Sequence, residues 1–217
     1  MNDRTVVYYT SNREDERFEA KIRERLLKTI GDIPLISVSQ KPIDFGYNIC
    51  VGDVGISDQN VHRQLQIGAQ HAKTKYVISA ESDCLYPEAY FKYTPPIIDG
   101  CFRCNNLYIL YKDKGPFYRK RYSECAQICG RDFLIREVDK YLEGQPMWNP
   151  VKYHGHQVVG ILFWKKNWTL FETSIPVLNV KTGNGLHPRT RIMEGWNETE
   201  IPHWGTVEKM RKELFGE

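Results

Sequence analysis

The sequence predicts an α/β fold in which helices flank a mainly parallel central sheet. Apolar runs rich in β-branched and aromatic residues occur at residues 5–9, at residues 33–38 and just before residue 81, and stretches of helical periodicity separate them. Strands that alternate with helices favour a parallel sheet. The chain of 217 residues is long enough for one such domain and short for two, so we expect a single domain over residues 1–217.

The remaining elements follow in order from their hydrophobic patterns. Residues 14–29 are expected to form a charged helix, because apolar side chains recur every four positions and make one stripe that can lie on a sheet. Residues 44–58 have no clean period and are interpreted as a loop, and residues 59–73 as a second helix. The rest of the chain predicts a strand or hairpin at 100–111, a basic aromatic stretch at 118–122, a helix at 131–143, an irregular stretch at 147–157, strands at 158–164 and 169–180, and a short charged helix from about residue 206.

Composition excludes few functions. The net charge of +3 is too small to indicate a polyanionic partner, and the hydrophobic and charged fractions of 41% and 26% are ordinary for a globular protein. No apolar run has the length of a membrane span, and the first residues lack the apolar region of a signal peptide. We therefore expect a cytoplasmic protein with no membrane span.

The six cysteines are expected to be free thiols or metal ligands, because disulfides are rare without a secretion signal. Cys101 and Cys104, followed by Cys125 and Cys129, come near the spacing of a four-thiolate zinc site, although the second pair has helical spacing. Burial as small hydrophobic side chains is the other role of such thiols. A zinc-stabilised nucleic-acid binding module is therefore one alternative.

The most informative feature is a pair of carboxylates, Glu81 and Asp83, directly after an apolar strand. Alternation along a strand points these two side chains to the same side, with Ser82 facing away. Mg²⁺ and Mn²⁺ favour carboxylate oxygen and usually complete their ligand shell with water and substrate phosphate. Acidic residues also end strands in solvated turns, so the context of the pair decides between a metal site and a surface turn.

That context resembles the family 2-like nucleotide-sugar glycosyltransferases of the GT-A fold. In such enzymes a first strand ends in a Thr/Asn-containing turn, and a later helix of the form G-x-x-x-A-K leads into a hydrophobic strand that ends in D-x-D, commonly followed by a Pro. The resemblance covers about residues 5–90. Its matching residues here are Thr10-Ser11-Asn12, then Gly68 to Lys73, then Glu81-Ser82-Asp83 and Pro87.

Two departures from the family pattern stand out. The first acid of the motif is Glu81 rather than Asp, which keeps a carboxylate on a longer arm. Family members usually carry an Arg and an Asn just before the helix Gly, whereas Leu65-Gln66-Ile67 occupies that place here and Arg63 lies upstream. We expect Gln66 to supply the amide and Arg63 to reach the donor phosphates or base, although a solvated helix face is an equal interpretation of both.

The resemblance implies a single GT-A (Rossmann-like) domain, with residues 1–95 as the donor-binding half and residues 96–217 as the acceptor-side half. It implies a metal-dependent glycosyltransferase that moves a sugar from a nucleotide-diphosphate sugar to a hydroxyl acceptor, with Mn²⁺ or Mg²⁺ as cofactor. The expected metal ligands are Glu81, Asp83 and a late His, for which His187 is the candidate and His154 and His156 are rivals.

The donor-binding residues are expected to gather around the same metal. A strand feeding a Gly-flanked loop lets the backbone approach a diphosphate, with cationic side chains available to offset its charge. The expected set comprises Thr10, Ser11, Asn12, Arg63, Gln66, Ser82, Lys181 and Arg189.

The catalytic base and the acceptor are less defined. The E-D pair that normally follows the acceptor-side helix is absent from residues 144–157, so Asp132 is the candidate base, with Glu137 and Glu172 as replacements. The acceptor is expected to be a glycan, a protein or a hydroxylated base in DNA. The basic aromatic stretch at 118–122 keeps the DNA option open, because cations contact phosphate and rings stack on bases.

A nucleotidyltransferase is the other alternative enzyme, because it also places carboxylates around a metal at a strand end. It would normally need a Gly-rich, basic loop after the first strand, which residues 10–14 do not supply.

Overall fold

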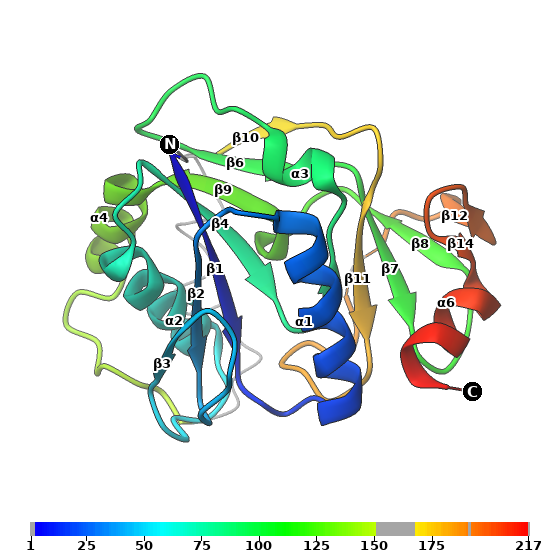
Figure 1. Cartoon of the computed structure of the whole chain (residues 1–217), viewed down its shortest axis with the longest axis horizontal. Helices are drawn as coiled ribbons and strands as arrows, with labels where there is room; N and C mark the ends of the chain where they lie inside the picture. Colours follow the sequence, from blue (N-terminus) through cyan, green and yellow to red (C-terminus); the bar gives the residue numbers. More distant parts are fainter. Residues whose placement is uncertain (1–2, 151–167, 191, 217) are drawn as a thin grey trace.

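The computed structural model describes residues 3–150, 168–190 and 192–216, and Figure 1 shows their arrangement. A seven-stranded, mainly parallel sheet has helices on both faces, which confirms the predicted fold class. Its strand order is β10-β6-β9-β4-β1-β2-β3. The strands are β1 Arg4–Thr10, β2 Leu35–Ser39, β3 Tyr47–Cys50, β4 Tyr76–Glu81, β6 Cys101–Cys104, β9 Gln127–Gly130 and β10 Trp168–Phe171.

A second sheet of five strands, in the order β12-β8-β7-β11-β5, lies beside the first. Its strands are β5 Cys84–Leu85, β7 Leu107–Tyr111, β8 Phe117–Lys120, β11 Val177–Lys181 and β12 Asn197–Glu198, and a small hairpin is made by β13 Glu200–Ile201 and β14 Gly205–Thr206. The helices are α1 Glu16–Ile30, α2 Asp58–His71, α3 Glu88–Lys92, α4 Arg131–Tyr141 and α6 Val207–Phe215, with a 3₁₀ turn η1 at Glu124–Ala126.

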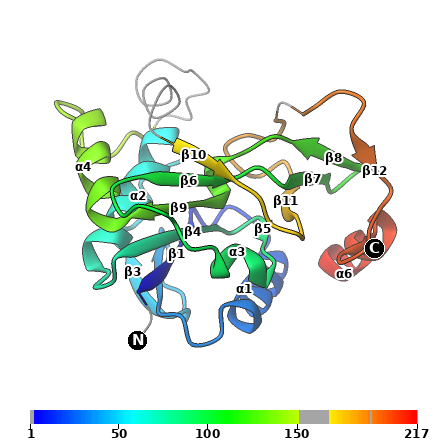
Figure 2. The ribbon, with the colours of Figure 1, turned by 90° about the horizontal axis from the view of Figure 1, so that it is seen from above.

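Side chains of β1 alternate between two hydrophobic cores. Val7 and Tyr9 pack with α2 and α4, whereas Val6 and Tyr8 pack with α1, α3 and the second sheet. Figure 2 shows α2 and α4 on one side of the larger sheet and α1 and α3 on the other. This alternation is the period of two that a strand buried on both faces requires.

Helix α2 approaches β1 closely at Gly68. A methyl group added at Gly68 would lie 2.3 Å from Cγ1 of Val7, which is far inside van der Waals contact. The glycine of the G-x-x-x-A-K motif therefore has a packing reason, because only its missing side chain lets the helix lie this near the strand.

Three connections cross from the first sheet to the second. The chain passes from β4 to β5, from β6 to β7 and from β10 to β11. The region expected to be one strand or hairpin at 100–111 is instead two strands in different sheets, and the strand expected at 169–180 is divided in the same way. Side-chain amides fix these crossings; Asn106 Nδ2, for example, donates to the carbonyl of Thr173 at 2.8 Å.

Other differences from the expected elements are small. A short edge strand, β3, forms inside the region expected to be a loop, because its backbone pairs in parallel with β2. The strand expected at 158–164 lies outside the described residues, as do His154 and His156. Among the described helices, none combines the length and the apolar character that crossing a bilayer requires.

Candidate functional site

The acidic pair lies where the two sheets meet. Strand β4 ends at Glu81, and the chain turns through Ser82 and Asp83 before it enters β5 in the second sheet. The backbone N–H of Val180 in β11 donates to the carbonyl of Asp83 at 2.7 Å. Asp83 is therefore held between the carboxyl end of a central parallel strand and the last residues of β11.

The carboxylate of Asp83 is buried and is contacted by two side chains of β11. Asn179 Nδ2 donates to Oδ1 at 2.7 Å, and Lys181 Nζ donates to Oδ2 at 3.1 Å. The thiol of Cys84 also lies 3.3 Å from Oδ1. These contacts hold the Asp83 side chain in one orientation, and charge-assisted hydrogen bonds such as the one from Lys181 are stronger than neutral ones.

Glu81 lies opposite Tyr9 in the register of β4 and β1. The hydroxyl of Tyr9 donates to Oε1 of Glu81 at 2.6 Å. The pKa of Glu81 is raised to about 7, chiefly by burial and then by the charge of Asp83, while Lys181, the Tyr9 hydrogen bond and Lys120 oppose the shift. The site therefore holds a carboxyl group that changes protonation state near neutral pH.

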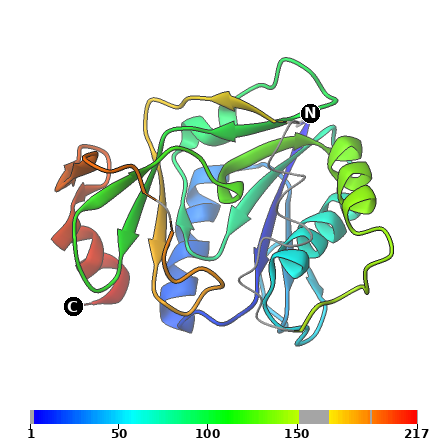
Figure 3. The ribbon, with the colours of Figure 1, turned by 180° about the vertical axis from the view of Figure 1, so that it is seen from behind.

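The loop after β11, residues 182–190, crosses the carboxyl ends of the parallel strands. Thr182 Oγ1 donates to Glu14 Oε2 at 2.6 Å, just before α1, and His187 Nε2 lies 3.0 Å from Asp58 Oδ1 at the start of α2. Figure 3 shows this loop, in orange, beside the end of α1 that follows β1. The loop is therefore tied to the residues that precede α1 and to the first residue of α2, at the edge of the sheet where β1 ends.

Glu14 forms part of the same charged cluster. The pKa of Glu14 is raised to about 7, chiefly by burial and also by the charge of Asp83, whereas the hydrogen bond from Thr182 and the charge of Lys181 oppose the shift. Two carboxyl groups of the cluster are thus shifted toward neutral pH, which is typical of functional sites although not unique to them.

Of the residues expected at the end of β1, Asn12 shapes the loop. Its backbone has φ 53°, in the left-handed region that Asn tolerates, and its Oδ1 accepts from the N–H groups of Gln40 and Lys41 at 2.9 and 2.8 Å. Thr10 Oγ1 accepts from the N–H of Asn12 at 2.9 Å. Ser11, between them, is partly exposed at the same edge of the sheet.

Two other expected donor residues serve the packing of α2. Gln66 Nε2 donates to Asp139 Oδ1 at 2.6 Å and to the carbonyl of Ile135 at 3.2 Å, which ties α2 to α4. Arg63 donates to Gln66 Oε1 at 3.0 Å. The structure thus accounts for Gln66 by helix packing, whereas Ser82 is partly exposed beside the acidic pair and Arg189 is exposed on the loop above it.

The structure does not bring Asp132 to the acidic pair. Helix α4 follows β9, and Gly130 lies opposite Tyr76, at the amino end of β4. Asp132 is therefore separated from Glu81 by the length of that strand, about 16–20 Å, and its exposed carboxylate pairs with Arg131. Glu137 lies on the same helix, and Glu172 is exposed after the edge strand β10.

His187 is likewise placed away from the acidic pair. Its partner is Asp58, and among the described residues its imidazole does not form a three-ligand group with Glu81 and Asp83. The loop that carries His187 nevertheless begins at Lys181, which contacts Asp83 directly.

Sequence patterns missed Tyr9, Lys120, Asn179 and Glu14 as members of this site. A parallel pairing of the first strand with the strand before Glu81 would have indicated Tyr9, because it places Tyr9 beside Glu81. Lys120 and Asn179 come from the second sheet, whose position beside the first follows from no local pattern.

The oxygen donors of Glu81 and Asp83 are compatible with Mg²⁺ or Mn²⁺, the cofactors that the resemblance implies. The charge of Asp83 already raises the pKa of Glu81, so a dication between them would offset a repulsion that the fold builds in. The ammonium of Lys181, in β11, already neutralises part of this negative charge.

The four-thiolate zinc site that the sequence left open as an alternative is not formed by the described cysteines. Cys101 pairs in register with Cys129 across β6 and β9, whereas Cys104 contacts Thr173, and these thiols do not gather with Cys125 within the described residues. The reason is topological, because the second thiol pair belongs to a turn and a strand rather than to one helix.

The basic aromatic stretch at 118–122 is largely used for internal contacts. Arg119 lies over the ring of Tyr108, 5.2 Å from its centroid, and donates to the carbonyl of Asn105 at 2.8 Å. Tyr122 packs against Trp168. Lys120 faces the acidic site, since the charge of Glu81 acts on it.

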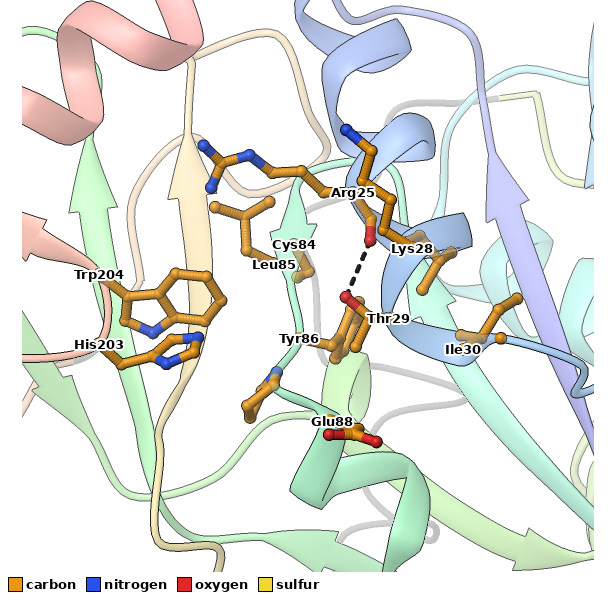
Figure 4. A pocket seen from close by; sticks show the side chains of 13 residues that line it. Arg25, Lys28, Thr29, Ile30, Cys84, Leu85, Tyr86, Glu88, His203 and Trp204 are labelled. Atoms are coloured by element: carbon orange, nitrogen blue, oxygen red, sulfur yellow. Dashed lines mark hydrogen bonds between the residues drawn. The ribbon is translucent and has the colours of Figure 1, made fainter.

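A pocket of about 670 Å³ lies against the C-terminal half of α1. Figure 4 shows Trp204 and His203 on one side and Arg25 and Lys28 on the other. Cys84, which follows Asp83, also lines this pocket, whereas Glu14 precedes the opposite end of α1.

Comparisons with known proteins support the fold. No family model matches the chain, and no curated protein matches it in sequence. Among solved structures, Staphylococcus aureus TarS 1-349 in complex with UDP-GlcNAc is similar with a TM-score of 0.53 and 9% identity over 91% of this chain and 62% of that one.

Two further structures are similar at lower TM-scores. A glycosyltransferase involved in glycosylation of the major capsid of PBCV-1 has a TM-score of 0.46 and 10% identity, covering 98% of both chains. The bifunctional IspDF from Campylobacter jejuni has a TM-score of 0.42 and 10% identity over 79% of this chain. This chain spans about half the length of the Campylobacter one, at 50%. The likeness to TarS places the chain in the α/β class of fold that TarS uses, and extends no further than fold.

Proposed function

We propose that this protein is a metal-dependent glycosyltransferase of the GT-A type that transfers a sugar from a nucleotide-diphosphate sugar to a hydroxyl acceptor. The observation that carries the proposal is the placement of Glu81 and Asp83 at the carboxyl end of β4, under a loop that starts at Lys181. In open α/β sheets this edge is where ligands bind. The UDP-GlcNAc bound to TarS supports a nucleotide-sugar donor.

The chemistry requires the leaving diphosphate to be stabilised as negative charge builds on it. Glu81 and Asp83 would hold the dication, and His187, which the structure pairs with Asp58, would be the third ligand that the resemblance implies. When bound, Mn²⁺ or Mg²⁺ neutralises charge on the diphosphate. Lys181, which contacts Asp83, and Arg189, which is exposed on the loop after β11, would offset the negative charge of the diphosphate.

The nucleoside lies against the end of β1 in this proposal. Asn12 holds the loops after β1 and β2 together, which leaves the partly exposed Ser11 and the backbone around it to contact the base or ribose. Arg63 and Gln66 contribute indirectly, by fixing α2. The proposal gives Asp132 no part in proton transfer, because that carboxylate lies at the other end of β4.

The experiment is a thermal-shift screen of nucleotide sugars and nucleoside triphosphates, each with and without Mn²⁺, on the wild-type chain and Asp83→Asn. A ligand that binds only the folded state raises the melting temperature. We expect a nucleotide sugar to do so with Mn²⁺, and the shift to be lost in Asp83→Asn and kept in Asp132→Asn, which changes an exposed carboxylate of the same type.

Product analysis then separates the enzyme classes. Release of a nucleoside diphosphate from the binding nucleotide sugar supports glycosyl transfer. Release of pyrophosphate from a nucleoside triphosphate would instead support nucleotidyl transfer and overturn the proposal, as would an unchanged melting shift in Asp83→Asn.

A further inference from the structure

Two buried thiols lie close to one carboxylate of the acidic pair. Glu81, Cys84 and Cys125 each offer one ligand atom, and these three atoms lie within 4.8 Å of one another. Cys84 follows Asp83 in β5, and Cys125 lies in the 3₁₀ turn before β9. Both cysteines are free and buried, so their thiols are held in place by packing.

The spacing of these three atoms is close to that of the ligand atoms around a tetrahedral metal ion. Ligand atoms 2.0–2.3 Å from a tetrahedral zinc ion stand about 3.3–3.8 Å apart, so the three atoms need to approach by no more than about 1.5 Å. A donor set of two thiolates and a carboxylate binds Zn²⁺ and Cd²⁺ in preference to Mg²⁺. A fourth position would stay open to water or substrate.

The surroundings orient the ligands and offset their charge. The amide of Asn179 donates to Cys84 Sγ at 3.0 Å, and Tyr9 donates to Glu81 at 2.6 Å. Such contacts around a metal site fix its ligands. The ammonium groups of Lys120 and Lys181 both act on Cys125 and Glu81.

The geometry points to a binding site for a thiophilic dication, formed by Glu81, Cys84 and Cys125, that shares Glu81 with the proposed Mg²⁺ or Mn²⁺ site. Because both sites use Glu81, zinc held by the thiols withdraws Glu81 from the diphosphate site. Zinc is therefore an inhibitor of transfer; this second statement rests on the proposed function, whereas the binding does not.

The test titrates Cd²⁺ into the purified full chain and follows the ultraviolet charge-transfer absorption of cadmium–thiolate bonds. All proteins carry Cys50→Ser, which removes the exposed thiol. We expect one equivalent of Cd²⁺ to bind, Zn²⁺ to displace it, and Cys84→Ser or Cys125→Ser to weaken binding at least about 100-fold.

Cys101→Ser is the matched control, because Cys101 and Cys129 form the other buried thiol pair, in register across β6 and β9. It should bind Cd²⁺ as the parent does. Binding that survives in Cys84→Ser and Cys125→Ser, or is lost in Cys101→Ser, overturns the proposal. Circular dichroism checks that each variant folds. Glu81→Gln leaves both thiols intact and tests whether the third ligand contributes to Cd²⁺ binding.

Inhibition is measured separately on donor hydrolysis with Mn²⁺ present. Zinc should inhibit the Cys50→Ser parent and inhibit Cys125→Ser at least about 10-fold less. A chain that binds Cd²⁺ as expected but has no transferase activity would contradict the proposed function and leave the thiol site standing.

Discussion

Lys181 and Asp83 form a largely buried ion pair that joins the two sheets at the candidate site. Nζ lies 3.1 Å from Oδ2, although 98 positions separate the residues in the chain. Burial by itself would lower the pKa of Lys181, but the charges of Asp83 and Glu81 outweigh it and raise the pKa above its ordinary value. The ammonium is therefore charged at every physiological pH, and it lies beside the acids where we propose that the diphosphate binds.

Replacing Lys181 by Met should lower kcat/KM for donor hydrolysis by about 100-fold, because a fixed cation no longer meets the developing charge. Lys181→Arg should keep part of the activity. Lys28→Met, which removes an exposed lysine paired with Glu24, is the control. Steady-state kinetics at saturating Mn²⁺ measure the effect, and wild-type kinetics in Lys181→Met would argue against a role for this cation.

The raised pKa of Glu81 predicts how stability depends on pH. In the folded state Glu81 has a pKa of about 7, against its ordinary 4.5, so the folded chain holds a proton that the unfolded chain has released. The contribution of Glu81 to the free energy of unfolding is therefore fully present below its ordinary pKa of 4.5. It is lost as the pH rises through its folded-state pKa of about 7. The free energy of unfolding should fall by up to about 1.4 kcal/mol per pH unit in that window.

Urea unfolding of the wild-type chain and of Glu81→Gln between about pH 5 and pH 7.5 measures this slope. The difference between the two proteins isolates Glu81 from Glu14, whose pKa is also raised to about 7. Added Mn²⁺ should flatten the wild-type curve, since a bound cation favours the ionised carboxylate. Equal slopes in both proteins would show that Glu81 is not the titrating group.

Gly68→Ala should destabilise the chain, although Ala is the better helix former. The new methyl would meet Val7 Cγ1 at 2.3 Å, so α2 must move from β1. We expect a loss of about 1–3 kcal/mol in the free energy of unfolding. Gln70→Ala, at an exposed position of the same helix, is the control and should leave stability nearly unchanged. A Gly68→Ala protein as stable as Gln70→Ala would mean that the helix does not lie this close.

Variants of His187 and Asp58 distinguish two roles of His187, which are to ligate the metal and to anchor the loop after β11 to α2. If His187 ligates the metal during transfer, His187→Ala should lower kcat/KM by at least about 10-fold and raise the Mn²⁺ concentration needed for half activity. Asp58→Asn, which removes only the partner seen in this structure, should leave the Mn²⁺ requirement unchanged. Equal Mn²⁺ dependence in both variants would assign His187 to anchoring the loop.

Local patterns determined much of this architecture. The strands that end at Thr10 and Glu81 and the helices α1 and α2 follow from apolar periodicity, which depends only on near neighbours in the chain. The same patterns placed Glu81 and Asp83 at a strand end. The packing of Gly68 against Val7 gives the sequence motif a physical basis.

The tertiary structure decided what surrounds those acids. Asn179 and Lys181 reach Asp83 because β11 pairs with β5, and Asp132 is carried away because β9 runs antiparallel to β4. The thiols of Cys84 and Cys125 meet beside Glu81 rather than joining Cys101 and Cys104. Each of these contacts depends on which strands become neighbours, and that choice reflects the burial of whole sheets and helices rather than the spacing of residues along the chain.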